Sequence, residues 1–504
     1  MICPSPIVVN HSALSTYLPA QCAVEPLVIS VLPWCGCSFG QADFVFEFRY
    51  ASCDVFAKEA RSGGAGRSRP DCDMFEKLLH DALVKGVTTG TLEVVYPSGR
   101  REIYGPRGGR EVAVRIRDTS ALRAIALDPG LAVGEMYMEG RLVVERGDVG
   151  DLLDLSFSSF RADTLTAAGR LGDLGRGAIG RLARGAGHAG IARRNVAHHY
   201  DLDERLYRLF LDEDMQYSCA WFERPDMSLE AAQLAKKRLI AAKLMVRPGA
   251  RVLDIGCGWG GMALYLARVC GAEVTGITLS EEQLRVATRR VEEAGLSGRV
   301  RFRLQDYRDV TERFDAAVSV GMLEHVGIGR MRDYMATVSR VLEPHGVMLL
   351  HSIANARPTT YTSPFIAKHI FPGGRVPALS QIVGPAEAAG LLFREIEILP
   401  LHYAETLREW RRRFLAARDA VLEFYDERFL RMWEFYLAGS EMSFRHRDLH
   451  VVHLEIVKDF ESLPIVRGFV EAEMSRLRQV EAAFPDYARF HEVPSGRRRP
   501  TAAE

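Results

Sequence analysis

The sequence predicts an α/β fold: a Rossmann-like doubly wound sheet, preceded by a smaller N-terminal α+β domain. Two patterns carry this prediction. After Pro248, buried-strand patterns alternate regularly with helical patterns, as in a sheet covered by helices on both faces. Before residue 150, short strand patterns separated by turn residues accompany a few helical ones, which is typical of a small mixed domain.

The smaller domain is expected over residues 74–165. Its elements, in order, are a helix over 75–83, a hairpin of strands 91–96 and 102–104 around Pro97-Ser98-Gly99, a strand over 111–117, a helix over 118–127 and a strand over 141–145. No motif in this domain points to chemistry. It is therefore predicted to pack against the larger domain or to present substrate.

The larger domain is expected over residues 196–490, and its sheet begins with the strand 250–255. The elements that follow are the helix 261–269, the strand 272–277, the helix 281–294, the strands 299–304 and 314–320, the helix 330–342 and the strand 347–352. In such sheets ligands bind at the carboxyl ends of the strands. The residues that follow each strand are therefore the first candidates for a site.

Three segments show no pattern of a packed domain. Residues 1–73 hold six of the nine cysteines and are predicted to be poorly ordered or to precede the true start at Met74. Residues 166–195 are rich in Gly and Arg and predict a solvated basic linker, with a weak amphipathic helix on anionic lipid as the alternative. Residues 491–504 are expected to form a disordered tail. No metal site is predicted, because Cys35 and Cys37 lack a matching second pair.

Composition narrows the classes of partner. Lys plus Arg and Asp plus Glu both total 65, so no overall field favours nucleic acid. No apolar run is long enough to span a bilayer, and the first residues lack the basic start of a secretory signal. A soluble intracellular protein that does not bind nucleic acid is expected.

The segment Asp254-Ile-Gly-Cys-Gly-Trp-Gly-Gly261 joins a strand to a helix through glycines and predicts a nucleotide-like pocket. Its first, second and fourth glycines fit a dinucleotide site, whereas its first three glycines after the aspartate fit a site for S-adenosylmethionine. A dinucleotide site needs an acidic residue about 20 residues further on. The second strand ends instead in Thr278-Leu-Ser280, which disfavours NAD and is also unusual for a methyltransferase. The methyl donor is favoured, with NAD and an unliganded glycine turn as alternatives.

Polar side chains follow two further strands of the predicted sheet. Glu324 and His325 come after the strand 314–320, and His351 ends the next strand. Taken singly, His351 could be a satisfied core histidine and Glu324 a carboxylate at a helix start. Because the ends of adjacent strands meet at one edge, their joint position favours a functional site.

Several separated segments together resemble the cyclopropane-fatty-acyl-phospholipid synthase family, which has the class I methyltransferase fold. They are His199-Tyr-Asp-Leu202, Met215-Gln-Tyr-Ser-Cys-Ala220, Val252 to Gly261, Gly276-Ile-Thr-Leu-Ser280, Gln305-Asp-Tyr307, Val318-Ser-Val-Gly-Met-Leu-Glu-His-Val-Gly327, His351-Ser-Ile353 and Tyr361 to Gln381 with Ile370-Phe-Pro-Gly-Gly374. The resemblance covers about residues 196–486 and extends more loosely to residues 74–160.

The resemblance implies transfer of a methylene group from S-adenosylmethionine to the cis double bond of unsaturated phospholipid acyl chains, forming cyclopropane fatty acids. It implies a bound bicarbonate as the base, held by the catalytic residues Cys219, Glu324, His351, Ile353 and Tyr403. It places the donor against Tyr217, Ser218, Asp254, Gly256, Gly258, Thr278, Leu279, Gln283, Gln305 and Asp306. Thr278 and Gln283 would then replace the missing second-strand carboxylate. Cys219 is expected to orient the anion rather than to act as a nucleophile, because no base neighbours it.

The resemblance also implies a cytoplasmic protein, peripheral to the inner membrane, which meets its phospholipid substrate at the membrane surface. It leaves a homodimer open. Residues 355–385 are expected to roof the acyl channel, and residues 407–437 show one long helical pattern whose aromatic side chains mostly pack the core. Two alternatives stay open. One is methylation of the same double bond that leaves a methyl branch, and the other is a non-catalytic lipid-binding protein.

Overall fold

The computed structural model describes residues 70–159, 202–358, 362–447 and 449–491. These residues belong to one compact unit that begins at Arg67. The expectations for residues 1–69, for the linker 166–195 and for the tail from residue 492 lie outside the described residues. Helix α1 (Pro70–Gly86) begins before Met74, so the predicted boundary at Met74 falls inside a helix.

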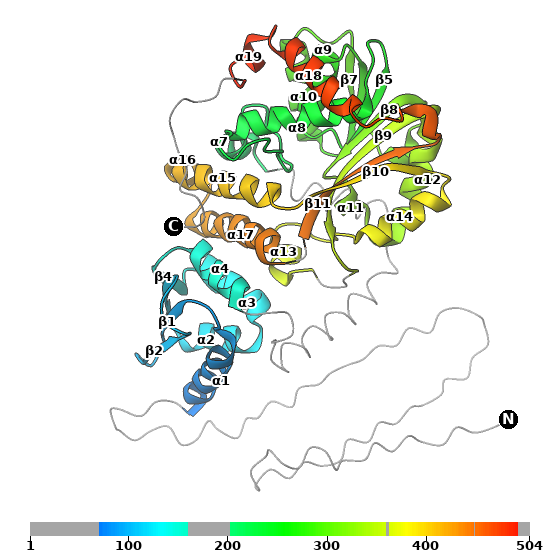
Figure 1. The fold of residues 1–504 in the computed structure, drawn as a ribbon. Helices are drawn as coiled ribbons and strands as arrows, with labels where there is room; N and C mark the ends of the chain where they lie inside the picture. Colours follow the sequence, from blue (N-terminus) through cyan, green and yellow to red (C-terminus); the bar gives the residue numbers. More distant parts are fainter. Residues whose placement is uncertain (1–69, 160–201, 359–361, 448, 492–504) are drawn as a thin grey trace, which may run out of the picture. The chain divides into compact units, whose positions relative to one another are not determined.

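Residues 70–159 form a four-stranded sheet with helices packed on it (Figure 1). The strand order is β2 (Arg101–Tyr104), β1 (Thr91–Val95), β3 (Glu111–Ile116) and β4 (Leu142–Arg146), and β1 runs antiparallel to β2 and parallel to β3. The predicted strands and the helices α1 and α2 (Thr119–Leu127) are present. The structure adds α3 (Pro129–Met138) and α4 (Val149–Ser159), which the sequence analysis missed.

The large sheet has seven strands and confirms the predicted doubly wound α/β fold. Its order is β10 (Leu392–Leu399), β11 (Leu449–Val457), β9 (Leu342–Asn355), β8 (Phe314–Val320), β5 (Arg251–Ile255), β6 (Glu273–Thr278) and β7 (Val300–Leu304). The strands from β9 to β7 are parallel, whereas β11 is antiparallel to both of its neighbours. Strands β10 and β11 were not predicted from the sequence.

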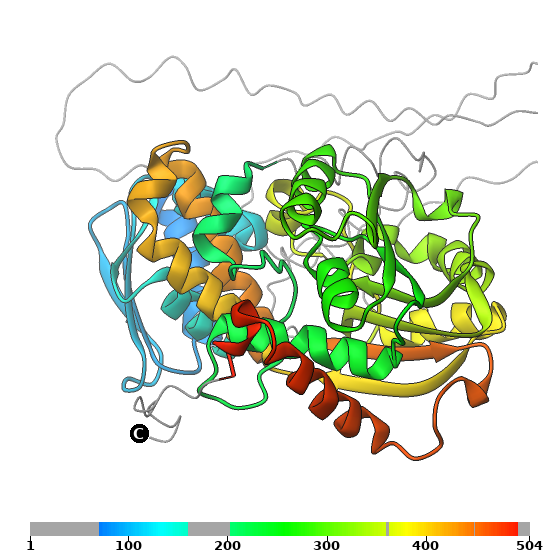
Figure 2. The ribbon, with the colours of Figure 1, turned by 90° about the horizontal axis from the view of Figure 1, so that it is seen from above.

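Helices cover both faces of this sheet (Figures 1 and 2). One apolar cluster unites one face with α8 (Leu229–Leu244), α9 (Gly261–Val269), α10 (Glu281–Glu293) and α18 (Phe469–Glu481). A second cluster unites the opposite face with α12 (Met331–Val341) and α14 (Leu379–Ala388). Short helices α7 (Glu204–Phe210), α11 (Leu323–Val326), α13 (Pro364–His369) and α19 (Pro485–Ala488) lie in the connections.

The segment 407–437 is not one helix, so that prediction is wrong. It belongs to α15 (His402–Ala416), α16 (Arg418–Leu422) and α17 (Glu427–His446). The break before α17 has a local cause: the Asp426 carboxylate accepts a hydrogen bond from the backbone N–H of Phe429 and caps the new helix. Helix α17 also contacts α3 and α4 of the N-terminal domain, and Tyr137 Oη on α3 donates to Glu434 Oε2 over 2.7 Å.

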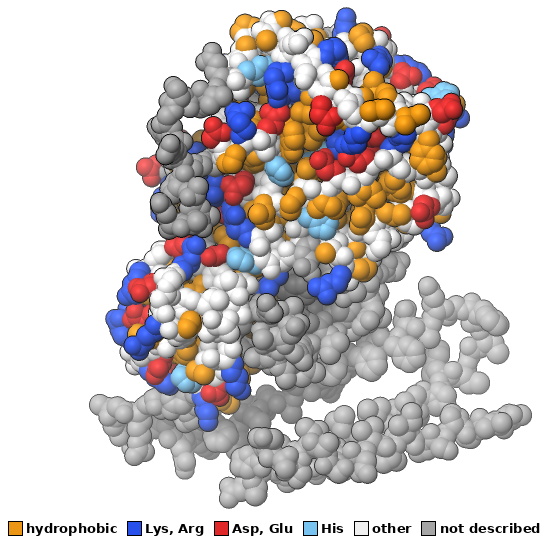
Figure 3. Space-filling view, viewed as in Figure 1, with side chains coloured by type: hydrophobic (Ala, Val, Ile, Leu, Met, Phe, Trp, Pro, Cys, Tyr) orange, Lys and Arg blue, Asp and Glu red, His pale blue; other side chains and the backbone are white. Residues whose placement is uncertain are grey.

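Acidic and basic side chains are intermixed with apolar ones on the face of the described residues seen in Figure 3. This mixture agrees with the equal totals of the two signs in the sequence. None of the helices that the structure describes combines the length and the apolar composition needed to cross a bilayer.

Candidate active site

A pocket lies at the carboxyl ends of β5, β6, β7 and β8. All ten donor-site residues expected from the resemblance line it: Tyr217, Ser218, Asp254, Gly256, Gly258, Thr278, Leu279, Gln283, Gln305 and Asp306. The same pocket is lined by Trp259, Met322 and His325. Residues from five separate segments of the chain therefore meet where a doubly wound sheet places its ligand.

The glycine turn after β5 forms one wall of the pocket. Gly256 has a φ of 80°, and a Cβ added there would lie 2.8 Å from Met322 Cγ, so only glycine fits. Gly258 also has a positive φ, but a Cβ added there meets no protein atom within 4 Å. The turn is thus tightly packed at Gly256 and open at Gly258.

Asp254 lies near the end of β5 with its carboxyl group buried. Its Oδ2 makes no hydrogen bond within the described part of the chain. Burial raises the pKa of Asp254 to about 7, against a smaller opposing effect of the Lys236 charge. A buried carboxyl oxygen without a partner suits a ligand that brings its own donor or positive charge.

Thr278 and Gln283 meet at the end of β6, where a carboxylate is missing. Thr278 Oγ1 donates to Gln283 Oε1 over 2.8 Å and accepts from the Ser280 backbone N–H at 3.1 Å. Ser280 in turn caps α10, because its Oγ accepts from the Gln283 backbone N–H at 3.2 Å. The end of β6 therefore positions Gln283, on the first turn of α10, at the pocket.

The polar residues after β7 are held by their own neighbours. The Asp306 carboxylate accepts from Arg308 Nε at 2.8 Å and from Arg308 Nη2 at 2.6 Å. Burial tends to raise the pKa of Asp306, but the hydrogen bonds and charge of Arg308 outweigh it and the pKa is lowered. Gln305 Nε2 donates to the Asp309 carbonyl oxygen at 3.0 Å.

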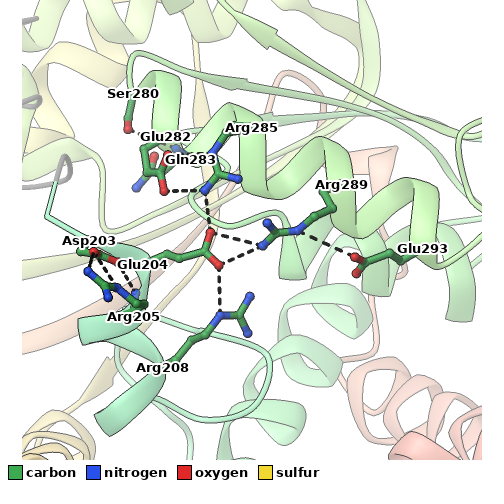
Figure 4. Close-up of polar contacts among 10 residues, drawn as sticks. All are labelled: Asp203, Glu204, Arg205, Arg208, Ser280, Glu282, Gln283, Arg285, Arg289 and Glu293. Carbon is green, nitrogen blue, oxygen red and sulfur yellow. Dashed lines mark hydrogen bonds and ion pairs between the residues drawn. The ribbon is translucent and has the colours of Figure 1, made fainter. Parts of the chain in front are cut away.

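Helix α7 is tied to α10 by the Glu204 carboxylate, which accepts from two guanidinium groups of α10 and from one of α7 itself (Figure 4). Glu204 accepts from Arg208 Nε at 3.2 Å, from Arg285 Nη2 at 2.8 Å and from Arg289 Nη2 at 2.9 Å. Tyr207, on the same helix, lies 5.2 Å from Tyr217 and 5.3 Å from Trp259 between ring centres. The Glu204 network thus holds aromatic contacts of the pocket lining in place.

The floor of the site contains a buried lysine that the sequence analysis missed. Lys236 Nζ donates to Gln216 Oε1 at 2.7 Å and to Ser218 Oγ at 2.8 Å. Burial lowers its pKa to about 8, although the Asp212 charge opposes this. Its positive charge reaches Asp254, Cys219 and His351, because it lowers the pKa of each. The only signal in the sequence is the Lys236-Lys-Arg238 triplet inside an otherwise apolar helical pattern.

Glu324 and Ile353 are the catalytic candidates in direct contact. The Ile353 backbone N–H donates to Glu324 Oε1 over 2.6 Å, and Glu324 Oε2 makes no hydrogen bond within the described residues. Burial raises the pKa of Glu324. The buried carboxyl group can therefore carry a proton on Oε2 and donate it to a neighbouring anion.

Cys219, Ile353 and Tyr403 belong to one apolar cluster, in which Tyr217, Trp410 and Tyr436 also pack. The Cys219 thiol donates to the Ala220 carbonyl oxygen at 3.2 Å, and burial raises its pKa, so it is held as a thiol. Tyr217 stacks on Trp410 at 5.1 Å and its hydroxyl lies 2.8 Å from that of Tyr436. Tyr217 is thus shared by the donor pocket and this aromatic cluster.

His351, a further catalytic candidate, contacts a second histidine on the next strand of the sheet. Its Nδ1 lies 2.8 Å from His453 Nε2, on the neighbouring strand β11. Burial, together with the charges of Lys236 and Lys243, lowers the pKa of His351 to about 3. The imidazole is therefore neutral near pH 7.

A family model described as mycolic acid cyclopropane synthetase matches residues 189–454. The chain is 38% identical to the cyclopropane-fatty-acyl-phospholipid synthase of Escherichia coli (strain K12) over 357 residues. The aligned segment covers 68% of this chain and 87% of that protein. It is 36% identical to the tuberculostearic acid methyltransferase of Mycobacterium tuberculosis, over 73% of this chain and 88% of the other. The chain belongs to the mycolic acid cyclopropane synthetase family. It is an S-adenosylmethionine-dependent methyltransferase.

Solved structures agree with this membership. The cyclopropane synthase MmaA2 of Mycobacterium tuberculosis matches with a TM-score of 0.51 and 33% identity, over 52% of this chain and 97% of that one. The mycolic acid cyclopropane synthase CmaA1, solved with S-adenosylhomocysteine and a detergent, matches with a TM-score of 0.50 and 34% identity over 52% of this chain. A separate model of a domain of unknown function matches residues 79–163.

His325 also lines the pocket. Its position after β8 was noted from the sequence, but it was not among the predicted site residues. Its ring meets Phe371 edge-on at 5.7 Å, and burial lowers its pKa to about 4. The segment 362–385 also reaches the site, since the Arg375 backbone N–H donates to the Glu324 carbonyl oxygen at 3.0 Å.

Proposed function

We propose that this chain transfers a methylene group from S-adenosylmethionine to the cis double bond of unsaturated phospholipid acyl chains, forming cyclopropane fatty acids. The observation that carries the proposal is the position of Tyr217, which lines the donor pocket and stacks within the aromatic cluster that holds Cys219 and Tyr403. A sulfonium methyl in the pocket and an apolar chain in the cluster would meet at this residue. The 38% identity to the Escherichia coli phospholipid enzyme supports the choice of substrate.

The pocket suits the donor. Asp254 offers a buried oxygen without a partner to the cationic end of S-adenosylmethionine, and the open space at Gly258 lets the ligand approach the backbone. Gln283, oriented by Thr278, can donate its amide N–H to a ribose hydroxyl. These residues, with Tyr217, Ser218, Gly256, Leu279, Gln305 and Asp306, are proposed to hold the donor.

The reaction requires the protein to position the double bond and the methyl donor and to exclude water from them. An alkene is a weak nucleophile, so the double bond must lie against the sulfonium methyl. Methyl transfer leaves a carbocation, which aromatic faces such as those of Tyr217 and Trp410 can stabilise. One proton must then leave the transferred methyl as the ring closes.

We propose that Cys219, Glu324, His351, Ile353 and Tyr403 hold a bicarbonate ion, which would supply the base for that proton. The fit rests on Glu324: its raised pKa allows Oε2 to donate to an anion, while Oε1 is fixed by the Ile353 N–H. Tyr403 lies in the same cluster as Ile353 and Cys219 and can donate through its hydroxyl. The neutral His351 can accept or donate one hydrogen bond.

A second candidate function uses the same donor and double bond but ends in a methyl branch. The 36% identity to a tuberculostearic acid methyltransferase favours keeping it. The contact of Glu324 with Ile353, which shares a cluster with Cys219 and Tyr403, favours ring closure, because a base positioned there would remove the last proton.

We further propose that the chain meets its phospholipid at the cytoplasmic membrane surface as a peripheral protein. The test of the function is to incubate the purified full chain with labelled S-adenosylmethionine and liposomes of cis-unsaturated phospholipid, and to analyse the acyl chains by mass spectrometry. Cyclopropane chains are expected, and methyl-branched chains would establish the second candidate. Label in protein or nucleic acid, or none, would refute the lipid assignment. Sedimentation of the same preparation tests whether it is a homodimer.

A further inference from the structure

Three ionisable side chains lie in one row across three neighbouring strands. His351 on β9 is directly opposite His453 on β11, and His453 is directly opposite Glu397 on β10. Residues directly opposite on paired strands place their side chains on the same face of the sheet. Strand β10 is an edge strand of the sheet. The row therefore runs from the proposed base site to the edge of the sheet.

The row connects a buried end to an exposed end. His351 and His453 are 2% and 0% exposed, and their ring nitrogens Nδ1 and Nε2 lie 2.8 Å apart. His453 Nδ1, on the far side of its ring, is 3.9 Å from Glu397 Oε2 and makes no hydrogen bond within the described residues. The Glu397 side chain is 32% exposed and pairs with Lys243 of α8. The row therefore ends at a carboxylate in contact with water.

The groups around His453 keep both imidazoles neutral. Besides His351 and Glu397, His453 faces Lys236 and Lys243 from α8 and His402 from α15. Burial and these positive charges lower the pKa of His453 well below its ordinary value, as they lower that of His351. Each ring then carries one N–H and one bare nitrogen.

Glu397 decides which nitrogen carries the hydrogen. A carboxylate facing His453 Nδ1 favours the N–H on that nitrogen, so Nε2 is bare and accepts a hydrogen bond. His351 Nδ1 must then be the donor across the 2.8 Å contact. This arrangement leaves His351 Nε2 bare, as a proton acceptor rather than a donor.

Building on the proposed function, we propose that Glu397 and His453 act as a relay that fixes the tautomer of His351 and carries the reaction's proton to solvent. The proton that the proposed base site takes from the transferred methyl passes to His351 Nε2, and the proton on His351 Nδ1 moves to His453 Nε2. The proton on His453 Nδ1 moves to Glu397 and then to water. One proton enters and one leaves, and the two rings exchange tautomers until the reverse shift restores them.

The last gap needs a small movement, because 3.9 Å exceeds hydrogen-bond length. A rotation of the half-exposed Glu397 carboxylate, or one bridging water, closes it. Glu395 provides a matched control. It lies two residues away on β10 and also pairs with Lys243, at 3.1 Å, but it stands opposite Glu455 rather than His453.

The tautomer is tested without turnover. Long-range proton–nitrogen correlation spectra of the full chain labelled with ¹⁵N-histidine, assigned with single His variants, should show His351 and His453 both protonated on Nδ1. Glu397→Gln should shift this distribution, and Glu395→Gln should leave it unchanged. A wild-type His351 protonated on Nε2, or no change in Glu397→Gln, overturns the relay.

The transfer is tested by comparing products. His453→Gln keeps an acceptor toward His351 but cannot pass a proton on. We expect it to form cyclopropane about tenfold or more slowly, a modest share of what proton-transfer catalysis contributes, at unchanged KM for S-adenosylmethionine. Slow proton loss from the methyl lets the carbocation lose a proton from a neighbouring chain carbon instead and leave a methyl branch, so cyclopropane formed per S-adenosylhomocysteine should fall below the wild-type ratio. Glu397→Gln should follow in the same direction, and Glu395→Gln should change neither value.

The outcomes separate the relay from the function on which it rests. A wild-type chain that makes no cyclopropane refutes the proposed function, while the spectra still decide the tautomers. Wild-type product ratios and rates in both His453→Gln and Glu397→Gln overturn the relay alone. If His453→Gln unfolds, as its melting temperature would reveal, Glu397→Gln at the exposed end carries the test.

Discussion

The backbone N–H of Ile353 donates to Oε1 of Glu324 over 2.6 Å, and this contact joins the ends of two parallel strands. Glu324 follows β8, whereas Ile353 lies on β9, in register beyond His351. The bond fixes one carboxyl oxygen and leaves the other, Oε2, buried without a hydrogen bond within the described residues. Glu324 and Ile353, which are 29 residues apart in the sequence, are thus joined directly in the structure.

Glu324→Gln should bind S-adenosylmethionine with an affinity within about twofold of wild type but lose turnover by about 100-fold or more. The amide can still accept from Ile353 and donate from its nitrogen, but it cannot exchange a proton. Isothermal titration and steady-state rates measure the two effects. Unimpaired turnover would exclude Glu324 from the proposed anion site.

Gly258→Ala should weaken donor binding by at least about tenfold, because the added methyl enters open space on the pocket wall. The positive φ alone should cost about 1–2 kcal/mol of unfolding free energy. Gly295→Ala is the control: its φ is also positive and its Cβ also meets no atom, but it lies outside the pocket. Equal donor affinity in the two variants would contradict the pocket assignment.

Local patterns predicted the strands β5, β6 and β8 because buried residues fill them almost continuously. The strands β10 and β11 escaped prediction because Glu395, Glu397, His453 and Glu455 interrupt their apolar pattern. These side chains are tolerated because they face Lys243 and one another across the sheet. A tertiary partner that is distant in sequence overrides the local rule.

The site shows the same division. The donor loop could be found from glycine spacing, since the spacing itself creates the backbone turn. The placement of Cys219 and Tyr403 depends on contacts across 186 residues, such as that of the Ala220 N–H with Thr406 Oγ1. From the sequence, those residues could be assigned only by resemblance to the family. Lys236 was found neither by local pattern nor by resemblance, because its contacts with Gln216 and Ser218 depend on how α8 packs.

Glu204→Gln should lower the free energy of unfolding by about 1 kcal/mol, since one carboxylate serves three arginines from two helices. Burial tends to raise the pKa of Glu204, but the arginines outweigh it and the pKa is lowered. This contribution is therefore present above the ordinary pKa of 4.5 and is lost as the pH falls below it. Glu282→Gln, which removes a partner of Arg285 alone, should cost less than about 0.5 kcal/mol. Urea unfolding at pH 7 and pH 4 compares them, and equal losses would show that the network adds nothing.

The affinity for S-adenosylmethionine should rise with pH between about 5.5 and 7.5, because the donor is cationic and Asp254 must ionise to pair with it. Burial raises the pKa of Asp254 from its ordinary 3.8 to about 7. Without ligand, the stability that the protonated carboxyl group gives to the fold is therefore lost as the pH rises from about 4 to about 7.

Because Asp254 is mostly protonated at pH 6, binding of the cationic donor at this pH should release a proton. Titration in buffers of different ionisation enthalpy detects this release. Asp254→Asn should abolish the release. Asp212→Asn should retain it, because the Asp212 pKa is also raised to about 7 by burial but its side chain does not line the pocket. Proton release that survives in Asp254→Asn would assign the pH dependence to another group. Lys236, whose charge acts on Asp254 and whose pKa is lowered to about 8 by burial, would be the first to examine.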